Sequence, residues 1–399
     1  MSSTDELSRV PMRGDDGRSP FATKPARRRR GPFFRVLQVV GALLLVFLLL
    51  TAVSIGRAVV RPGTDSVSAR VAEWARDHGL GGVVTRLEKA QYASDRPKQG
   101  GAPAGGVPQV GDAGAGRGVA VDGTPAPRPL PILAAGAALP NEGRWQGVVS
   151  VKGSPAVRLA FLRPDDQHTS YLAAVMWLDP RLVSARLHPG TQDPAGRWAT
   201  PSEISPALQR TVAAAFPAGF RLTGDSRGGY YDQGKTVRAM RAGAASFVIN
   251  ADGSVHIGAW GRDVAMTAQV RSVRQNLDLL VDKGTVNPTC ADNNSPVWGN
   301  TVGNRSYVPR TAMGQRADGS LVFVNSPATS VCSLGRLLQA AGVVRGMESD
   351  INRQWAVGYY YDHVNGRVVP HRSRPDQDHA ASQYFAVQSR DFIAFYARS

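Results

Sequence analysis

Residues 245–260 read ASFVINADGSVHIGAW, and this stretch indicates what kind of fold the chain adopts. Two runs rich in Val, Ile and Phe flank an Asp-Gly pair at 252–253, and this arrangement is a strong signal for a β-hairpin. The same pattern recurs at 312–324, AMGQRADGSLVFV, around the Asp-Gly pair at 318–319. Both stretches therefore predict antiparallel strand pairs.

Other short runs rich in Val, Tyr, Phe and Trp are also typical of strands: WQGVVSV, AVRLAFL, SYLAAVMWL, LVFVNS and VGYYYD. Three segments are predicted to be helical instead: SPALQRTVAA (205–214), TAQVRSVRQNL (267–277) and SLGRLLQAAG (333–342). In the last helix Ser333 is the expected N-cap and Gly342 the C-terminal glycine. We therefore predict one α+β domain over 143–399, with mixed or antiparallel sheets and a few helices.

Ahead of this domain lies a run of twenty residues without a charge, Val36 to Ile55. As a helix, twenty residues span about 30 Å, the thickness of a hydrocarbon core, so we predict one transmembrane helix at 34–58. Residues 1–35 carry nine Lys/Arg against four Asp/Glu, which places the N-terminus in the cytoplasm and the later residues outside the cell. A cleaved signal peptide is the alternative, although the apolar run is long for one. The predicted location is the cell membrane, with a single pass and an extracellular C-terminal domain.

The remaining segments are assigned by composition. Residues 1–33 are polar and basic, and we expect a disordered cytoplasmic tail. Residues 59–96 show apolar residues near helical spacing and predict short juxtamembrane helices. Residues 97–142 are rich in Gly, Pro and Ala and predict a flexible linker. The net charge of +16 is spread along the chain without a basic stripe interleaved with aromatics, so nucleic acid is not an expected partner.

The two cysteines, Cys290 and Cys332, both fall in the predicted exterior domain. An even count in an oxidising compartment predicts one disulfide, and two free buried thiols are the alternative. No His, Cys, Asp or Glu cluster has the spacing of a metal site, and the sequence lacks a P-loop, HExxH, GxSxG and CxxC. We therefore expect neither a metal nor a cofactor.

Five segments in a fixed order resemble the phosphodiester glycosidase family, which includes N-acetylglucosamine-1-phosphodiester alpha-N-acetylglucosaminidase and exopolysaccharide-related proteins. They are TVAAAFPAGFRLTGDSRGGYYDQGKTVRAMRAGAASFVINADGSVHIGAWGRDV, VRQNLDLLVDKG, WGN, RTAMGQRADGSLVFV and LGRLLQAAGVVRGMESDIN. The resemblance covers about residues 145–397. Arg310 and Thr311 open a stretch that matches the family's Arg-Thr-Ala-x-Gly strand. Asp350 stands where the family's closing Leu-Asp-Gly-Gly loop has its aspartate.

The chain differs from the family pattern at two places. Pro217-Ala218 stands where the family has Asn-Gly, and Ile351-Asn352 replaces the Gly-Gly pair of the closing loop. These changes remove an asparagine and a flexible backbone that would let a phosphate approach closely. The chain therefore resembles a divergent member of the family, of actinobacterial type.

The resemblance implies hydrolysis of a sugar phosphodiester, and a glycan or polysaccharide of the cell envelope is the expected partner. Such a reaction passes through an oxocarbenium-like state that carboxylates stabilise, while arginine and backbone donors hold the phosphate. Glu348 and Asp350 are the predicted catalytic residues, because alternate residues of a strand share a face about 7 Å apart. Ion pairing with Arg310, Arg345 or Arg353 is the alternative role for the two carboxylates.

Further residues are candidates for substrate binding. Arg310 is the expected phosphate clamp, and the tyrosines at 230 and 231 could stack on a sugar, with core packing, capping or salt bridges as the alternatives. The candidate substrate-binding residues are Arg310, Thr311, Asn352, Tyr230, Tyr231, Asp232, Arg262, Asp263, Asn276 and Asp278. Two other functions remain open: a catalytically inactive glycan-binding module, and a structural protein of the cell envelope.

Overall fold

The computed structural model describes residues 32–94, 97–110, 126–222, 226–292, 296–299, 301 and 305–398. The chain divides into two compact units, the first ending at Arg57 and the second running from Ala58 to Ser399. The predicted cytoplasmic tail lies almost entirely outside the described residues, and so does the middle of the predicted linker, 111–125.

The first unit contains most of helix α1 (Pro32–Val59). Its stretch Phe33–Val59 has a mean hydropathy of 2.7 and, within the described part of the chain, is the one helix long and apolar enough to cross a membrane. A signal sequence near the N-terminus can meet the same criteria of length and hydropathy. The helix is therefore compatible with either a membrane anchor or a signal sequence.

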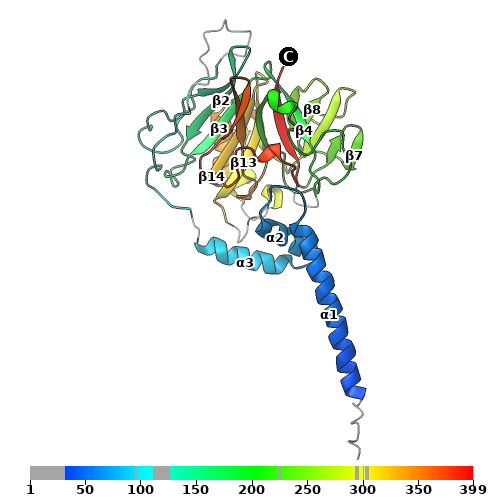
Figure 1. Cartoon of the computed structure of the whole chain (residues 1–399). Coiled ribbons are helices and arrows are strands. Elements are labelled where there is room, and N and C mark those ends of the chain that lie inside the picture. Colours follow the sequence, from blue (N-terminus) through cyan, green and yellow to red (C-terminus); the bar gives the residue numbers. More distant parts are fainter. Residues whose placement is uncertain are drawn as a thin grey trace, which may run out of the picture. The chain divides into compact units, whose positions relative to one another are not determined.

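The second unit begins with two helices, α2 (Val67–Asp77) and α3 (Gly81–Ser94), shown in Figure 1. Ser66 is the N-cap of α2, because its side chain accepts a hydrogen bond from the backbone N–H of Ala69 at 3.2 Å. Both helices lie in the segment for which short juxtamembrane helices are predicted.

The rest of the second unit is dominated by three sheets in which all neighbouring strands are antiparallel. The central sheet has the order β1 (Gln146–Val151), β2 (Ser154–Leu162), β3 (Ala173–Leu178), β14 (Leu321–Thr329), β13 (Val308–Arg316), β15 (Val343–Glu348), β11 (Leu279–Asp282) and β12 (Thr285–Val286). A second sheet has the order β7 (Lys235–Arg238), β6 (Tyr230–Asp232), β10 (Val270–Gln275), β8 (Ala245–Asn250) and β9 (Val255–Ala259). The third has the order β17 (Arg367–Arg372), β16 (Tyr359–Val364), β5 (Val212–Pro217), β18 (Phe392–Ala397) and β4 (Val183–His188).

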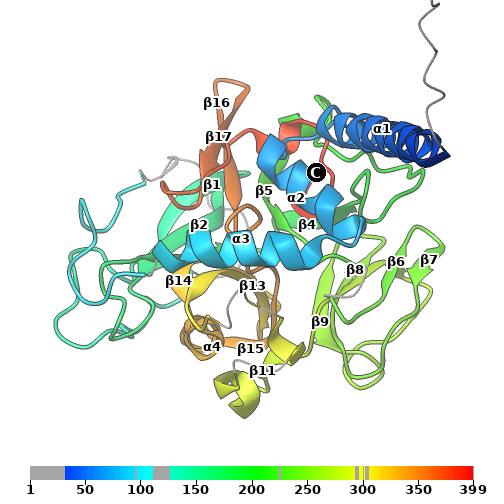
Figure 2. The same cartoon turned by 90° about the horizontal axis from the view of Figure 1, so that it is seen from below.

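One further α-helix and several short 3-10 helices accompany the sheets: α4 (Val331–Ala340), η1 (Leu208–Arg210), η2 (Pro288–Ala291), η3 (Pro296–Trp298) and η4 (Gln383–Phe385). Helix α4 lies beside β15 and β11 of the central sheet (Figure 2). The described part of the chain therefore has the predicted α+β architecture.

The central sheet is buried on both faces, and the first four residues of β14, LVFV, show the consequence for the sequence. Leu321 and Phe323 join the core between this sheet and the two smaller ones. Val322 and Val324 point to the other face and join the core beneath α4. A strand covered on both sides needs apolar residues at every position, so LVFV carries no alternation.

The strand and hairpin predictions are confirmed. Each of the seven apolar runs contains a strand, and β8 pairs with β9, and β13 with β14, across the two Asp-Gly turns. Two helix predictions are wrong. The segment 205–214 forms only η1 and the start of β5, whose small alanines fit between neighbouring strands. The segment 267–277 contains β10, where buried Arg274 and Gln275 have protein partners and mimic the polar positions of an amphipathic helix.

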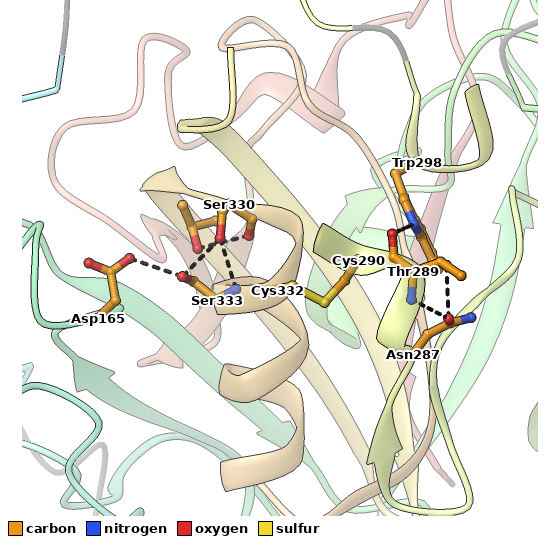
Figure 3. The surroundings of a disulfide bond; sticks show 9 residues. Asp165, Asn287, Thr289, Cys290, Trp298, Ser330, Cys332 and Ser333 are labelled. Carbon is orange, nitrogen blue, oxygen red and sulfur yellow. Dashed lines mark hydrogen bonds between the residues drawn. A yellow bond between two sulfur atoms is a disulfide. The ribbon is translucent and has the colours of Figure 1, made fainter. Parts of the chain in front are cut away.

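The third predicted helix exists as α4, but it starts earlier than expected. Ser330 is the N-cap and accepts a hydrogen bond from the N–H of Ser333 at 3.0 Å, so the prediction of Ser333 as N-cap is wrong. The Ser333 hydroxyl donates to Asp165 at 3.0 Å instead (Figure 3). Gly342 follows the helix with a φ of 77°, as its predicted C-terminal role requires.

The predicted linker is partly packed on the domain. The N–H of Val110 donates to the Gln146 side chain at 2.9 Å, and the N–H of Leu130 donates to the Gly143 carbonyl at 2.8 Å. Glu142 forms a buried ion pair with Arg163 at 2.9 Å. The described ends of the Gly/Pro/Ala-rich segment are therefore parts of the folded domain and differ from the free spacer that composition alone predicts.

The predicted disulfide is present between Cys290 of η2 and Cys332 of α4, and Figure 3 shows it beside Thr289 and Trp298. The Trp298 indole N–H donates to the Thr289 carbonyl at 3.0 Å, which fixes η3 against η2. The bond thus ties a short loop helix to the helix that covers the central sheet.

Removal of this disulfide should lower the free energy of unfolding by about 4 kcal/mol, because the bond closes a loop of about 40 residues in the unfolded chain. Urea unfolding of wild type with and without reductant, beside the variant Cys290→Ser/Cys332→Ser, measures the loss. Reductant should leave the variant unchanged, and equal midpoints for oxidised wild type and the variant would contradict the expectation.

The folded domain should also lose stability in mild acid through His188. Its Nδ1 lies 2.8 Å from the Pro201 carbonyl, its Nε2 lies 2.7 Å from the Tyr396 hydroxyl, and burial lowers the pKa of this imidazole to about 4. The unfolded chain takes up the proton near the ordinary pKa, whereas the folded chain does not. Stability should therefore fall by roughly 3 kcal/mol between pH 7 and pH 4.

Chemical denaturation at several pH values tests this expectation against two variants. His188→Gln should flatten the pH dependence, while His256→Gln, which changes an exposed histidine, should keep the wild-type slope. Parallel curves for wild type and His188→Gln would show that the imidazole does not carry the effect.

Candidate functional site

Glu348 is the last residue of β15, and it is fully buried against Arg310 of β13. One guanidinium nitrogen, Arg310 Nη1, lies 2.5 Å from Glu348 Oε1, and Arg310 Nε donates to the Thr329 carbonyl at 3.1 Å. Burial raises the pKa of the Glu348 carboxyl, and the charge of Arg310 opposes that rise. The other oxygen, Oε2, accepts no hydrogen bond from the described residues.

Asp350 follows β15 in a loop held by Thr311. The N–H of Thr311 donates to the Asp350 carbonyl at 2.8 Å, and the N–H of Asp350 donates to the Thr311 hydroxyl at 2.9 Å. The side-chain Oδ1 accepts from the N–H of Asn352 at 2.9 Å. Thr311 therefore holds the backbone of Asp350, and the N–H of Asn352 orients its side chain.

The second oxygen of Asp350 faces Arg390. Oδ2 accepts no hydrogen bond within the described part of the chain, and Arg390 Nη1 lies 3.4 Å away. Burial raises the pKa of the Asp350 carboxyl, while the charge of Arg390 lowers it. The Arg390 guanidinium also lies over the Trp355 ring at 4.6 Å, a cation–π contact that fixes its plane.

A second buried ion pair lies next to the first. Arg274 Nε donates to Asp391 Oδ2 at 2.7 Å, and both side chains are 1% exposed. Arg274 also donates to the carbonyls of Phe220 and Gln275. Burial raises the pKa of Asp391 to about 6 against the opposing charge of Arg274.

Asn276 connects two of the segments that carry the family resemblance, the one around 217–220 and the one that ends in β15 and Asp350. Its Nδ2 donates to the Glu348 carbonyl at 2.7 Å and to the Ser349 carbonyl at 3.1 Å, and its Oδ1 accepts from the N–H of Phe220 at 3.1 Å. The Ser349 hydroxyl donates to the Pro217 carbonyl at 2.7 Å. The segment at 217–220 and the end of β15 are thus held together by side-chain bonds.

A small cavity of about 10 Å³ lies where these segments meet, enough for about one water molecule. Its lining brings the Asp350 loop together with the chain ahead of β18. The lining residues are Pro217, Gly219, Asp350, Trp355, Tyr384, Gln388, Arg390 and Asp391. Glu348 and Arg310 do not line it, so the two predicted catalytic carboxylates have different surroundings.

The segment that contains α2 lies against this region. Thr64 donates to the cavity-lining side chain of Gln388 at 3.0 Å, and Asp77 of α2 lies 3.4 Å from Arg221. Partial burial raises the pKa of Glu73 in α2, while the charges of Arg390 and Arg221 lower it. The acidic side of α2 therefore faces two arginines at the edge of the candidate site.

The predicted sugar-stacking residues lie in β6. Tyr230 is fully buried and packs edge-on against Trp198 with ring centroids 5.9 Å apart, while Tyr231 is partly buried. Asp232 is buried and accepts a hydrogen bond from Ser272 at 2.5 Å. Tyr230 and Asp232 have surroundings typical of core packing, the alternative weighed for the tyrosines.

Three other candidates form surface ion pairs. Arg262 lies 2.8 Å from Asp282, and Asp263 lies 3.2 Å from Arg345 near the start of β15, whereas Asp350 follows its end. Asp278 pairs with Arg241. The structure does not bring these three together with Asp350. No group of three His, Cys, Asp or Glu side chains able to hold a metal occurs among the described residues.

Sequence reasoning missed the residues that surround Asp350 from other parts of the chain: Arg274, Trp355, Tyr384, Gln388, Arg390 and Asp391. One signal was available for the last two, since an Arg-Asp pair stands directly before the apolar strand FIAFYA. Burial of such a pair requires charged partners. Nothing in the sequence indicates that Asp350 and Arg274 are those partners.

The chain is an α+β domain of antiparallel sheets. Its candidate site consists of buried carboxylate–arginine pairs near the ends of β15, β10 and β18. The phosphodiester glycosidase family model matches residues 209–350, which supply Asp350, Arg274 and the segment at 217–220. The family resemblance seen in the sequence is confirmed over this range, so the chain carries a phosphodiester glycosidase-like domain. No curated protein matches the sequence.

Solved structures share similarity with the chain at low sequence identity. The catalytic domain of zebrafish N-acetylglucosamine-1-phosphodiester alpha-N-acetylglucosaminidase, auto-inhibited by its pro-peptide, is 16% identical with a TM-score of 0.40, over 64% of this chain and 88% of that chain. A hypothetical protein from Synechocystis is 12% identical with a TM-score of 0.36, over 64% of each chain. A putative exported protein from Burkholderia pseudomallei is 11% identical with a TM-score of 0.26, over 57% of this chain and 74% of that chain.

The ion pair between Arg274 and Asp391 should be necessary for folding. Asp391→Asn or Arg274→Met leaves one charge buried without its partner, and each change should lower the free energy of unfolding by about 3–5 kcal/mol. Urea unfolding measures both variants and the double variant Arg274→Met/Asp391→Asn. The double variant should lose less than the sum of the single losses, and strictly additive losses would contradict a direct interaction.

Proposed function

We propose that the domain hydrolyses a sugar phosphodiester in a glycan of the cell envelope. The family match at 209–350 supports this reaction class, and the position of Asp350 supports the site. Asp350 combines an oxygen without a hydrogen bond from the described residues and an arginine 3.4 Å away in one cavity. This combination is the single observation that carries the proposal.

In this reaction Asp350 acts on the anomeric carbon as the carboxylate that stabilises positive charge. Arg390 holds the phosphate, because its guanidinium is already oriented by Trp355. When substrate enters, the phosphate replaces Asp350 as the anion that this guanidinium contacts. Glu348 and Arg310 lie behind this region as a buried ion pair that fixes the ends of β15 and β13. Their role is positioning.

Substrate entry requires a change in the closed site, since a cavity of about 10 Å³ does not hold a sugar ring. The contacts of Thr64 with Gln388 and of Asp77 with Arg221 are exposed or half-buried and are replaceable by water. A movement of the segment from Thr64 to Asp77 would uncover Arg390. The proposed reaction therefore includes displacement of this segment.

A second function is supported by the same closure. The two carboxylates are 0% and 2% exposed, and the glycines of the family's closing loop are replaced by Ile351 and Asn352. On this second proposal, the domain binds a phosphate-bearing glycan without turning it over. In either case we propose that α1 anchors the chain, with the N-terminus in the cytoplasm and the domain outside.

Hydrolysis is tested with the purified full chain and a panel of synthetic sugar-1-phosphodiesters, with release of free sugar as the readout. Asp350→Asn should lower kcat/KM by at least about 100-fold, because it removes the charge that faces the reacting carbon. The matched control is Asp252→Asn, which makes the same chemical change in an exposed hairpin turn that accepts Asn-Gly equally well.

The outcomes separate the two functions. Turnover that Asp350→Asn abolishes and Asp252→Asn preserves supports the enzyme. Binding of the panel without release of sugar, measured by calorimetry on folded protein, supports the glycan-binding module. Turnover that survives in Asp350→Asn would remove Asp350 from the mechanism.

A further inference from the structure

Exposed apolar side chains are concentrated in one short part of the second unit. Outside α1, ten large apolar side chains of the described residues are exposed, and six of them fall within 28 residues. These six are Val60 at 78%, Val67 at 60%, Val71 at 37%, Leu80 at 46%, Val83 at 53% and Leu87 at 67% exposure. A cluster of this kind marks an interaction surface, whereas scattered exposed apolar residues need no explanation.

The exposed residues have helical spacing. Val67 and Val71 are four apart on α2, and Val83 and Leu87 are four apart on α3, with Leu80 one turn ahead. Residues four apart lie on the same side of a helix. Each helix therefore carries an apolar stripe that is exposed to solvent.

The contacts of α2 with the domain use a different side of the helix. Arg70 donates to the carbonyls of Val59, Arg61 and Gly63 and folds the preceding chain against α2. Asp77, two turns further along, contacts Arg221. This polar side lies about a quarter turn from the apolar stripe, so packing on the domain leaves the stripe uncovered.

The chain on either side indicates what covers the stripes. α1 ends at Val59 and α2 begins at Val67, so α2 starts within about 28 Å of the end of α1 even with a fully extended connection. The exposed arginine Arg86 stands beside the stripe of α3. Apolar residues beside arginines on a surface helix fit a phospholipid surface, in which the acyl chains meet the former and the phosphates the latter.

We propose that α2 and α3 lie on the membrane, with Val67, Val71, Leu80, Val83 and Leu87 inserted at the boundary between headgroups and acyl chains. This inference rests on the proposed membrane anchoring by α1. Arg86 contacts lipid phosphates. The domain is thereby held against the bilayer by two helices in addition to the anchor.

The test uses the full chain in nanodiscs of phosphatidylethanolamine and phosphatidylglycerol. Leu87→Cys carries an environment-sensitive fluorophore, and Cys290 and Cys332 do not react because they form a disulfide. Lipid bearing a doxyl quencher near the headgroup should remove more than about half of the emission from this label. The matched control is Val364→Cys, an exposed valine of β16 at 48% exposure that should keep its emission.

A third label separates this inference from the anchor on which it rests. Leu44→Cys in α1 should be quenched by doxyl groups deep in the acyl chains if α1 spans the bilayer. Quenching at Leu44→Cys without quenching at Leu87→Cys would overturn the surface-helix proposal alone, and absence of both would overturn the anchor as well. Cross-linking of two copies through Leu87→Cys without quenching would show that the stripe is an interface between copies, which also overturns the proposal.

Discussion

The buried ion pair between Arg274 and Asp391 is the constraint around which the candidate site is arranged. Arg274 lies in β10 of one five-stranded sheet, and Asp391 directly precedes β18 of the other. Both side chains are buried, so each charge needs the other for neutralisation. The two sheets must therefore pack in the one arrangement that brings Arg274 and Asp391 together. The same pair fixes Arg390 beside Asp350, since Arg390 is the residue before Asp391. The position of the site is therefore a consequence of how two sheets neutralise each other's charges.

Much of the fold is predictable because it depends on local signals. The Asp-Gly turns specify the hairpins β8–β9 and β13–β14, and uniformly apolar runs such as LVFV specify strands covered on both faces. Prediction failed where a strand carries buried polar groups. In β10 the polar residues Arg274 and Gln275 suggested the solvent-exposed face of a helix. In the structure both are buried, and their partners are Asp391 and Ser246, far away in the sequence. In β5 the run of alanines favours a helix by propensity, and pairing with β16 and β18 overrides that preference.

The candidate site was only half predictable for a related reason. Glu348, Asp350 and Thr311 belong to sequence segments whose order carries the family resemblance. Arg310 forms an ion pair with Glu348, which was the alternative role considered for this carboxylate. Arg390 and Trp355 complete the surroundings of Asp350 through contacts that no spacing reveals. The sequence also could not show that Asp350 lines a cavity whereas Glu348 does not, because that difference depends on where the chain turns after β15.

Helix α2 connects the closed site with the proposed membrane surface. Its acidic side faces Arg221 and Arg390, while its apolar stripe points elsewhere and has no cover from the domain. If the stripe rests on lipid, then a displacement that uncovers Arg390 also costs the burial of Val67 and Val71, roughly 1 kcal/mol or more for each side chain that returns to water. On the same proposal, an anionic glycan at Arg390 would compete with the charge of Glu73 and weaken the contact of α2 with the domain. If both proposals hold, access to the site is coupled to contact with the bilayer, because both faces belong to one rigid helix. Glycans close to the membrane surface would then be the ones best placed to enter.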